Sequence, residues 1–228
     1  MLKDLLQVWF PQCCLNCGNV LPKALQWLCL SCKSKLPRTY FEQGVTNPLE
    51  RSLLEAFPIT SAYAPYYFQQ QSPIQPLIHA LKYQGKKDVA TWVAQQSTSF
   101  IPKTHPIYTC EAVIPVPLHA ARERKRGYNQ VKLFGQFLAK HLGIPYLDSV
   151  LYRKRQTKTL VQMSHEARWN EVKDAFEVRG KHCFTHILIV DDVITTGATL
   201  TACGHTLLKH VSKEISISGM AYTQDILP

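Results

Sequence analysis

Several features that would place this protein in a common class are missing from its sequence. No stretch approaches the roughly 20 consecutive apolar residues that a membrane-spanning helix needs. The first ten residues, MLKDLLQVWF, carry Lys3 and Asp4 and lack a small-residue cleavage site, so they are not typical of a secretory signal. Acidic residues are scarce, with 16 Asp and Glu against 26 Lys and Arg. We therefore expect a cytoplasmic protein without membrane insertion, and the net charge of +10 favours an anionic partner.

A nucleotide-triphosphatase loop is also missing. The segment ILIVDD resembles the acidic strand of such enzymes, but they also need the pattern G-x4-G-K-[ST]. The two Gly-Lys pairs, at Gly85 and Gly180, are followed by Lys and His and have no glycine five residues earlier. The nine histidines show no metal-ligand spacing, and there are no repeats. These absences exclude the P-loop class and leave the acidic pair to be explained in another way.

Cysteine, in contrast, is concentrated near the N-terminus. Five of the eight cysteines lie between positions 13 and 32. Cys14-x2-Cys17 and Cys29-x2-Cys32 form two knuckles whose four thiolates can close a tetrahedron around zinc. Cys13 could replace Cys14 in that set, although its spacing to Cys17 fits less well. Because four protein ligands leave no open position, the sequence predicts a structural zinc site that supplies folding energy.

The chain divides into three predicted parts. Residues 1–40 form the zinc-binding double-knuckle module, residues 41–60 are a linker, and residues 61–228 form the main domain. Gly44, Asn47-Pro48 and Pro58 are the breakers that indicate the linker. Ahead of the cysteines, four apolar residues at helical spacing predict a short helix packed on the module, in preference to a membrane anchor: Leu2, Leu5, Leu6 and Trp9.

Strands and helices are expected to alternate through the main domain. The predicted strands are 61–68, 111–117, 186–190 and 215–222, and the predicted helices are 73–85, 129–143 and 198–210. This alternation is typical of an α/β fold with a parallel sheet flanked by helices. In such a sheet ligands bind at the carboxyl ends of the strands, where Asp191 and Asp192 fall.

The loop after these acids has the composition of a phosphate site. Thr195, Thr196, Gly197, Ala198 and Thr199 precede the predicted helix, and small residues there let backbone N–H groups converge on an anion. Two carboxylates beside a phosphate would repel it unless they faced another group. The vicinal hydroxyls of a ribose are suitable partners, and a divalent cation can share the charge. The pattern therefore predicts a phosphorylated ribose as ligand.

These segments resemble a known family. VDDVITTGATL is similar to the phosphoribosyl diphosphate (PRPP) loop of type I phosphoribosyltransferases. Together with IPVPLHAARERKRGYNQ, RQTKTLVQMSHEARWNEVKDAF, ALKYQGKKDVA and the four cysteines, it resembles the ComF family of competence proteins, which carry a phosphoribosyltransferase-type domain. The resemblance extends over nearly the whole chain. It implies a type I phosphoribosyltransferase-like fold, Mg²⁺ bound with PRPP, and Asp191 and Asp192 as catalytic residues if the domain is active.

The resemblance also implies where the diphosphate binds. Four cations on a glycine turn, Arg122, Arg124, Lys125 and Arg126 before Gly127, suit a diphosphate by charge alone. By resemblance Arg126 and Gly127 belong to the pyrophosphate loop with Tyr128, Asn129 and Gln130, whereas a solvated basic turn is the ordinary alternative. The stretch 151–176 resembles a hood that closes over the diphosphate, with four matching positions: Thr159, Gln162, Arg168 and Asn170.

The family works in natural transformation, and this implies single-stranded DNA as a second partner. Residues 118–183 carry 14 Lys and Arg against 6 Asp and Glu. Lys82, Tyr83, Arg122 and Arg124 are our tentative DNA-binding residues, although lysines at an ordinary helix end explain Lys82 equally well. We expect a competence protein that binds PRPP and handles DNA, alongside a competence helicase and strand-loading proteins. The alternative is an active phosphoribosyltransferase with an unidentified acceptor.

Overall fold

A parallel β-sheet forms the centre of the protein. The computed structural model describes residues 11–43, 46–118, 123–124, 127–154 and 175–224. Its four-stranded sheet has the order β1-β6-β5-β2, and every neighbouring pair is parallel. The strands are β1 (Ser61–Tyr63), β2 (Ala112–Pro115), β5 (Phe184–Ile194) and β6 (Ser212–Tyr222). The apolar residues in the middle of β5 are fully buried, as expected for a strand covered on both faces. The predicted α/β sheet is confirmed.

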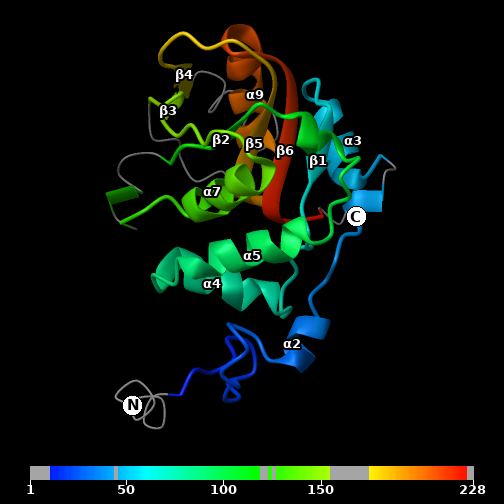
Figure 1. The fold of residues 1–228 in the computed structure, drawn as a ribbon, viewed down its shortest axis with the longest axis vertical. Coiled ribbons are helices and arrows are strands. Elements are labelled where there is room, and N and C mark those ends of the chain that lie inside the picture. The colour runs from blue at the N-terminus through cyan, green and yellow to red at the C-terminus, as the bar shows by residue number, and fades with distance from the viewer. Residues whose placement is uncertain (1–10, 44–45, 119–122, 125–126, 155–174, 225–228) are drawn as a thin grey trace.

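Helices cover both faces of this sheet (Figure 1). On one face α9 (Ala198–His210) packs on β5 and β6. On the other, α7 (Val131–Leu142) packs on β2 and β5, and its Gly135 lies against Val190. Next to α7 lies α5 (Asp88–Thr98), which packs in turn on α4 (Ile74–Tyr83).

The smaller elements lie around this core. The helical segments are α2 (Leu30–Ser34), η1 (Phe41–Gln43), α3 (Pro48–Leu54) and η2 (Pro106–Thr109). Strands β3 (Leu151–Arg153) and β4 (Phe176–Val178) pair as an antiparallel two-stranded sheet, and β4 packs on α9.

Helix α3 lies within the stretch predicted as a linker. Its start is fixed by a capping box, in which the N–H of Glu50 donates to Oδ1 of Asn47 at 2.9 Å and the N–H of Asn47 donates to Oε2 of Glu50 at 3.2 Å. The same two side chains bind the backbone of Ala62 in β1, at 2.9 and 3.0 Å. Leu49 and Leu53 of α3 are buried. This stretch is therefore packed onto the sheet.

The predicted elements agree with the structure in type, but all four strands differ in length from the prediction, β1 and β5 the most. Helix α9 covers the predicted residues, and α7 ends at Gly143, whose φ of 73° is the left-handed conformation common after a helix. The predicted strand 61–68 is shortened to β1, and beyond it Tyr67 makes only an isolated bridge. β5 is longer than predicted because β6 continues to pair with it, through Asp191 opposite Gly219 and on to Ile194.

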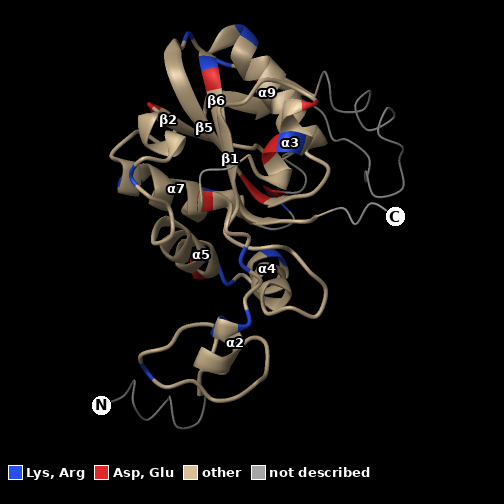
Figure 2. Ribbon diagram, turned by 90° about the vertical axis from the view of Figure 1, so that its right-hand side faces the viewer, with Lys and Arg blue, Asp and Glu red and all other residues tan. Residues whose placement is uncertain are grey.

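The cysteine-rich segment lies at one end of the molecule. In Figure 1 and Figure 2, α4 and α5 lie between α2 and the sheet. The helix predicted around Leu2 and Trp9 falls outside the described residues. Within the described part of the chain, no helix combines the length and the apolar character that crossing a membrane requires.

Candidate functional site

The two adjacent acids lie inside β5, near its carboxyl end, and point to opposite faces of the sheet. Successive residues of a strand alternate between faces. Asp192 faces α4, where its Oδ2 lies 2.8 Å from Nζ of Lys82. Asp191 faces α9: burial and the charge of Asp191 together raise the pKa of the Cys203 thiol. The acids thus have different surroundings, although they are neighbours in sequence.

These surroundings give Asp191 an unusual proton affinity. Burial and the adjacent charge of Asp192 raise the pKa of Asp191 to about 7, although Lys82 and Arg153 act in the opposite direction. Near neutral pH Asp191 therefore carries a proton for part of the time. A protonated carboxyl can donate a hydrogen bond as well as accept one, which suits a hydroxyl-bearing ligand.

The loop that follows the acids turns sharply into α9. Gly197 is the N-cap of α9 with a φ of 70°, and no side chain caps this helix end. The first N–H groups of a helix have no partner within the helix, so here they are available to an anion. A Cβ atom on Gly197 would lie 2.7 Å from Cδ2 of Leu53, so α3 packs directly beneath the loop. Thr195 is exposed, and Thr196 and Thr199 are half-buried.

The basic turn is anchored at the end of β2, the strand that lies beside β5. Gly127 has a φ of 76°, and its N–H donates to the carbonyl of Glu123 at 2.7 Å. Asn129 binds the carbonyl of Val116, just after β2, at 3.2 Å, and the hydroxyl of Tyr128 donates to the carbonyl of Leu81. The turn is thus fixed both to the carboxyl end of β2 and to α4.

Some predicted residues of this region cannot be placed. Arg124 is exposed. Arg122 and Arg126 lie outside the described residues, as do four predicted hood residues: Thr159, Gln162, Arg168 and Asn170.

The structure separates the two tentative DNA-binding residues of α4. Lys82 belongs to the acidic site through its ion pair with Asp192. Tyr83 is 67% exposed, and its ring lies 4.9 Å from that of His79. Of these two residues, Tyr83 is therefore the one that presents its side chain to solvent.

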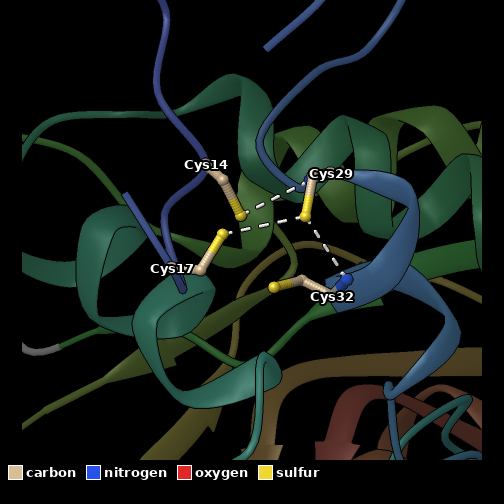
Figure 3. Close-up of side chains that lie close together, drawn as sticks. All are labelled: Cys14, Cys17, Cys29 and Cys32. Carbon is tan, nitrogen blue, oxygen red and sulfur yellow. Dashed lines mark hydrogen bonds between the residues drawn. The ribbon is translucent and has the colours of Figure 1, made fainter. Parts of the chain in front are cut away.

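Four cysteines form a compact cluster at the other end of the molecule (Figure 3). The sulfur atoms of Cys14, Cys17, Cys29 and Cys32 all lie within 4.8 Å of one another, and those of Cys17 and Cys29 are 3.7 Å apart. With a Zn–S bond of 2.3 Å, two ligands of a tetrahedron are separated by about 3.8 Å. The cluster therefore has the dimensions that hold a zinc ion.

Hydrogen bonds favour the thiolate form at Cys14, whereas at Cys32 the bond from Asn16 is outweighed by burial and the neighbouring cysteine sulfurs, which raise the pKa to about 12. The N–H of Cys29 donates to Sγ of Cys14 at 3.4 Å, and Nδ2 of Asn16 donates to Sγ of Cys32 at 3.2 Å. Burial acts to raise the pKa of Cys14, but the backbone N–H groups around it prevail and lower the pKa to about 6. Cys13 lies outside the cluster and is exposed. Cys14 is thus the cysteine of this pair that completes the set.

Comparison with known proteins bears on both regions. Residues 132–221 match the phosphoribosyl transferase domain family. The chain is 28% identical over 231 residues to competence protein F of Haemophilus influenzae, covering 91% of this chain and 96% of that protein. The predicted resemblance to the ComF family is confirmed.

Two further relatives carry related names. DNA utilization protein YhgH of Salmonella typhimurium is 29% identical over 148 residues, covering 64% of this chain and 65% of that protein. Competence protein ComFC of Bacillus subtilis is 25% identical over 137 residues, covering 60% of this chain and 54% of that protein. Together with the parallel sheet, the domain match confirms the phosphoribosyltransferase-like fold.

The matched range defines what belongs to the phosphoribosyltransferase-like domain of this chain. It begins in α7 and ends in β6, so it includes Asp191, Asp192 and the loop at Gly197. The cysteine cluster and Lys82 lie before it. The ComF resemblance, which covers nearly the whole chain, includes both parts.

Sequence reasoning missed one contributor to the site. Leu53 supports Gly197 from α3, and the pattern Asn47-Pro-Leu-Glu50 was a capping-box signal that could have revealed this helix. Arg153, at the end of β3, belongs to the stretch 151–176 that resembles a hood, and its charge acts against the raised pKa of Asp191.

Proposed function

We propose that this chain is a competence protein of the DNA-uptake pathway that binds PRPP at the carboxyl end of its sheet. The observation that carries the proposal is the uncapped start of α9 at Gly197, directly after two acids that lie in separate surroundings. Such a helix start accommodates a phosphate, and carboxyl groups accommodate ribose hydroxyls. The names of the relatives, which concern competence and DNA utilization, support the wider role.

Each part of the site has a task in this proposal. The N–H groups and hydroxyls of residues 195–199 hold the 5′-phosphate. Asp191 and Asp192 orient the ribose and stabilise the positive charge that develops at its C1. The turn at Gly127, with Arg126, receives the diphosphate. The carboxylate oxygens of this site are hard ligands that suit Mg²⁺, which when bound would neutralise part of the diphosphate charge.

A titration tests this site. Calorimetry with PRPP and Mg²⁺ should show saturable binding to the intact protein and none to an Asp191→Ala, Asp192→Ala variant that keeps its circular-dichroism spectrum. Binding retained by the variant would move the ligand elsewhere. The presence of both acids also favours the alternative of an active phosphoribosyltransferase. Its assay is the release of diphosphate from PRPP in the presence of candidate acceptors.

Single-stranded DNA is the second ligand of the proposal. The net charge of +10, the exposed Arg124 and the exposed ring of Tyr83 support binding by charge and base stacking, with strong salt dependence. Such a protein would act in the cytoplasm beside a competence helicase and strand-loading proteins. Neutralising Arg122, Arg124 and Arg126 should weaken binding of a labelled oligonucleotide and flatten its salt dependence. Unchanged binding would remove these arginines from the DNA surface.

The zinc module is structural in this proposal. A Cys29→Ser, Cys32→Ser variant should lose about one zinc per chain, and its N-terminal segment should become sensitive to protease. The phosphoribosyltransferase-like domain should keep its thermal transition. Stoichiometric zinc in the variant would contradict the four-cysteine assignment.

A further inference from the structure

Lys82 has a buried partner, which is unusual for a lysine at the end of a helix. It lies in the last turn of α4, and its Nζ is 2.8 Å from Oδ2 of Asp192. The side chains are only 21% and 16% exposed. A half-buried ammonium group loses much of its hydration, so leaving it without a neighbouring anion destabilises the protein.

The end of α4 is also bound to the basic turn. The hydroxyl of Tyr128, one residue after Gly127, donates to the carbonyl of Leu81. Nζ of Lys87 lies 4.7 Å from the centre of the Tyr128 ring. Lys82 therefore contacts an acid of the proposed ribose site, and the residue before it is bound to the turn that we assign to the diphosphate.

A bound ribose would change the position of Lys82. Ribose hydroxyls that bind Asp192 compete with the ammonium group for the same carboxylate. Lys82 then needs a second anion within reach of its flexible side chain. A diphosphate on ribose C1, bound at the turn that Tyr128 links to α4, would supply that anion.

We propose that Lys82 is a diphosphate-binding residue, held on Asp192 until PRPP arrives. The inference rests on the proposed function and adds one residue to its site. It assigns Lys82 to the proposed PRPP site instead of to DNA binding. Tyr83 stays among the residues predicted to bind DNA.

The test compares three ligands that share parts of PRPP. Calorimetric titrations with PRPP, inorganic diphosphate and ribose 5-phosphate, each with Mg²⁺, are made on the intact protein and three variants. Lys82→Ala removes the cation and Lys82→Arg keeps it. Lys86→Ala is the control. It removes a lysine charge four residues after Lys82, and the ammonium group of Lys86 lies 5.8 Å from the centre of the Trp27 ring.

The expected result separates the ligands. Lys82→Ala should weaken PRPP and diphosphate by about tenfold or more, the size of one charge-assisted hydrogen bond. It should leave ribose 5-phosphate unchanged or slightly tighter, because Asp192 is freed. Lys82→Arg should restore most of the diphosphate affinity, and Lys86→Ala should match the intact protein. Where ribose 5-phosphate binds too weakly to titrate, its displacement of PRPP gives the same comparison.

Two results would overturn the inference. Equal loss of all three ligands would mean that Lys82 only orients Asp192. Unchanged diphosphate affinity in Lys82→Ala would remove Lys82 from the site. A failure of the proposed function is a separate outcome, seen as absence of PRPP binding in the intact protein.

Discussion

The two ends of the parallel sheet differ in how their polar groups are hydrogen-bonded. At the amino end, buried polar side chains satisfy one another. His186 is 2.8 Å from Oγ1 of Thr109 and 2.9 Å from Oγ of Ser216, which is 2.7 Å from Oγ of Ser61. At the carboxyl end, two acids and an uncapped helix start leave hydrogen-bonding capacity for a ligand. A closed network, in which the polar side chains bond to one another, stabilises the fold. An open network, in which hydrogen-bonding groups lack protein partners, can bind a ligand.

Positive charge does not follow this division. The amino end has a cavity of about 660 Å³ whose lining includes three lysines, Lys154, Lys181 and Lys209, together with His182, His205, His210 and the acid Glu177. Two of these residues end α9, where the helix carbonyls carry partial negative charge. The basic side chain of Lys209 therefore complements the end of a helix. The loop that we propose as the phosphate site lies instead at the start of the same helix, where backbone N–H groups are available to an anion.

Removing the centre of the closed network should have the largest effect on stability. His186→Ala leaves hydroxyl groups without their partner and creates a cavity, so we expect a loss of about 2–4 kcal/mol in the free energy of unfolding. Urea denaturation measures this loss, with His182→Ala as the control at the same end of the sheet. A loss below that of His182→Ala would show that the network is not closed.

The contributions of the two ends to the stability of the fold should also depend on pH in opposite directions. Burial lowers the pKa of His186, so its contribution to stability is lost as the pH falls below the ordinary histidine value near 6.5. Burial and Asp192 raise the pKa of Asp191 from near 4 to about 7, so stability is lost as the pH rises through that range.

Asp191→Asn isolates the second effect. The variant should be more stable than the intact protein by an amount that grows from pH 4 to pH 7 and reaches about 1–3 kcal/mol. Urea denaturation at several pH values provides the comparison. A difference that stays constant over this range would contradict the raised pKa.

The contact between Leu53 of α3 and Gly197 at the carboxyl end should have a smaller effect on stability. Gly197→Ala places a Cβ against Leu53 and a left-handed conformation on alanine, which costs about 1–2 kcal/mol. The same change should cost less in a Leu53→Ala background, because the contact is gone. Thermal denaturation of the four proteins in this cycle measures the coupling. Additive costs would mean that α3 does not support the loop.

The smallest effect should come from the basic cavity. Lys209→Ala with His210→Ala removes one lysine and one histidine from its lining. We expect PRPP affinity to stay within about twofold of the intact protein, since a surface charge at the opposite end of the sheet from the proposed ligand is screened. Calorimetry checks this expectation. A loss as large as that caused by the acid variants would place the ligand at the amino end.

The sequence predicted what neighbouring residues determine. The apolar run of β5, the glycines that bound α7 and α9, and the cysteine spacing are local signals, and the structure contains each of these elements. Pairs distant in sequence were not predictable. Lys82 and Asp192 are 110 residues apart, and only the packing of α4 brings them together. The extension of β5 through the acids depends likewise on β6, which follows it in the chain.

The central claim is that the backbone at the start of α9 holds the phosphate of PRPP. Hydrogen–deuterium exchange of the intact protein, with and without PRPP and Mg²⁺, measures this directly. The account predicts slower exchange of the amide groups of residues 195–201 and unchanged exchange around residues 180–183 and 205–210. Protection confined to those two segments, with none at 195–201, would contradict it.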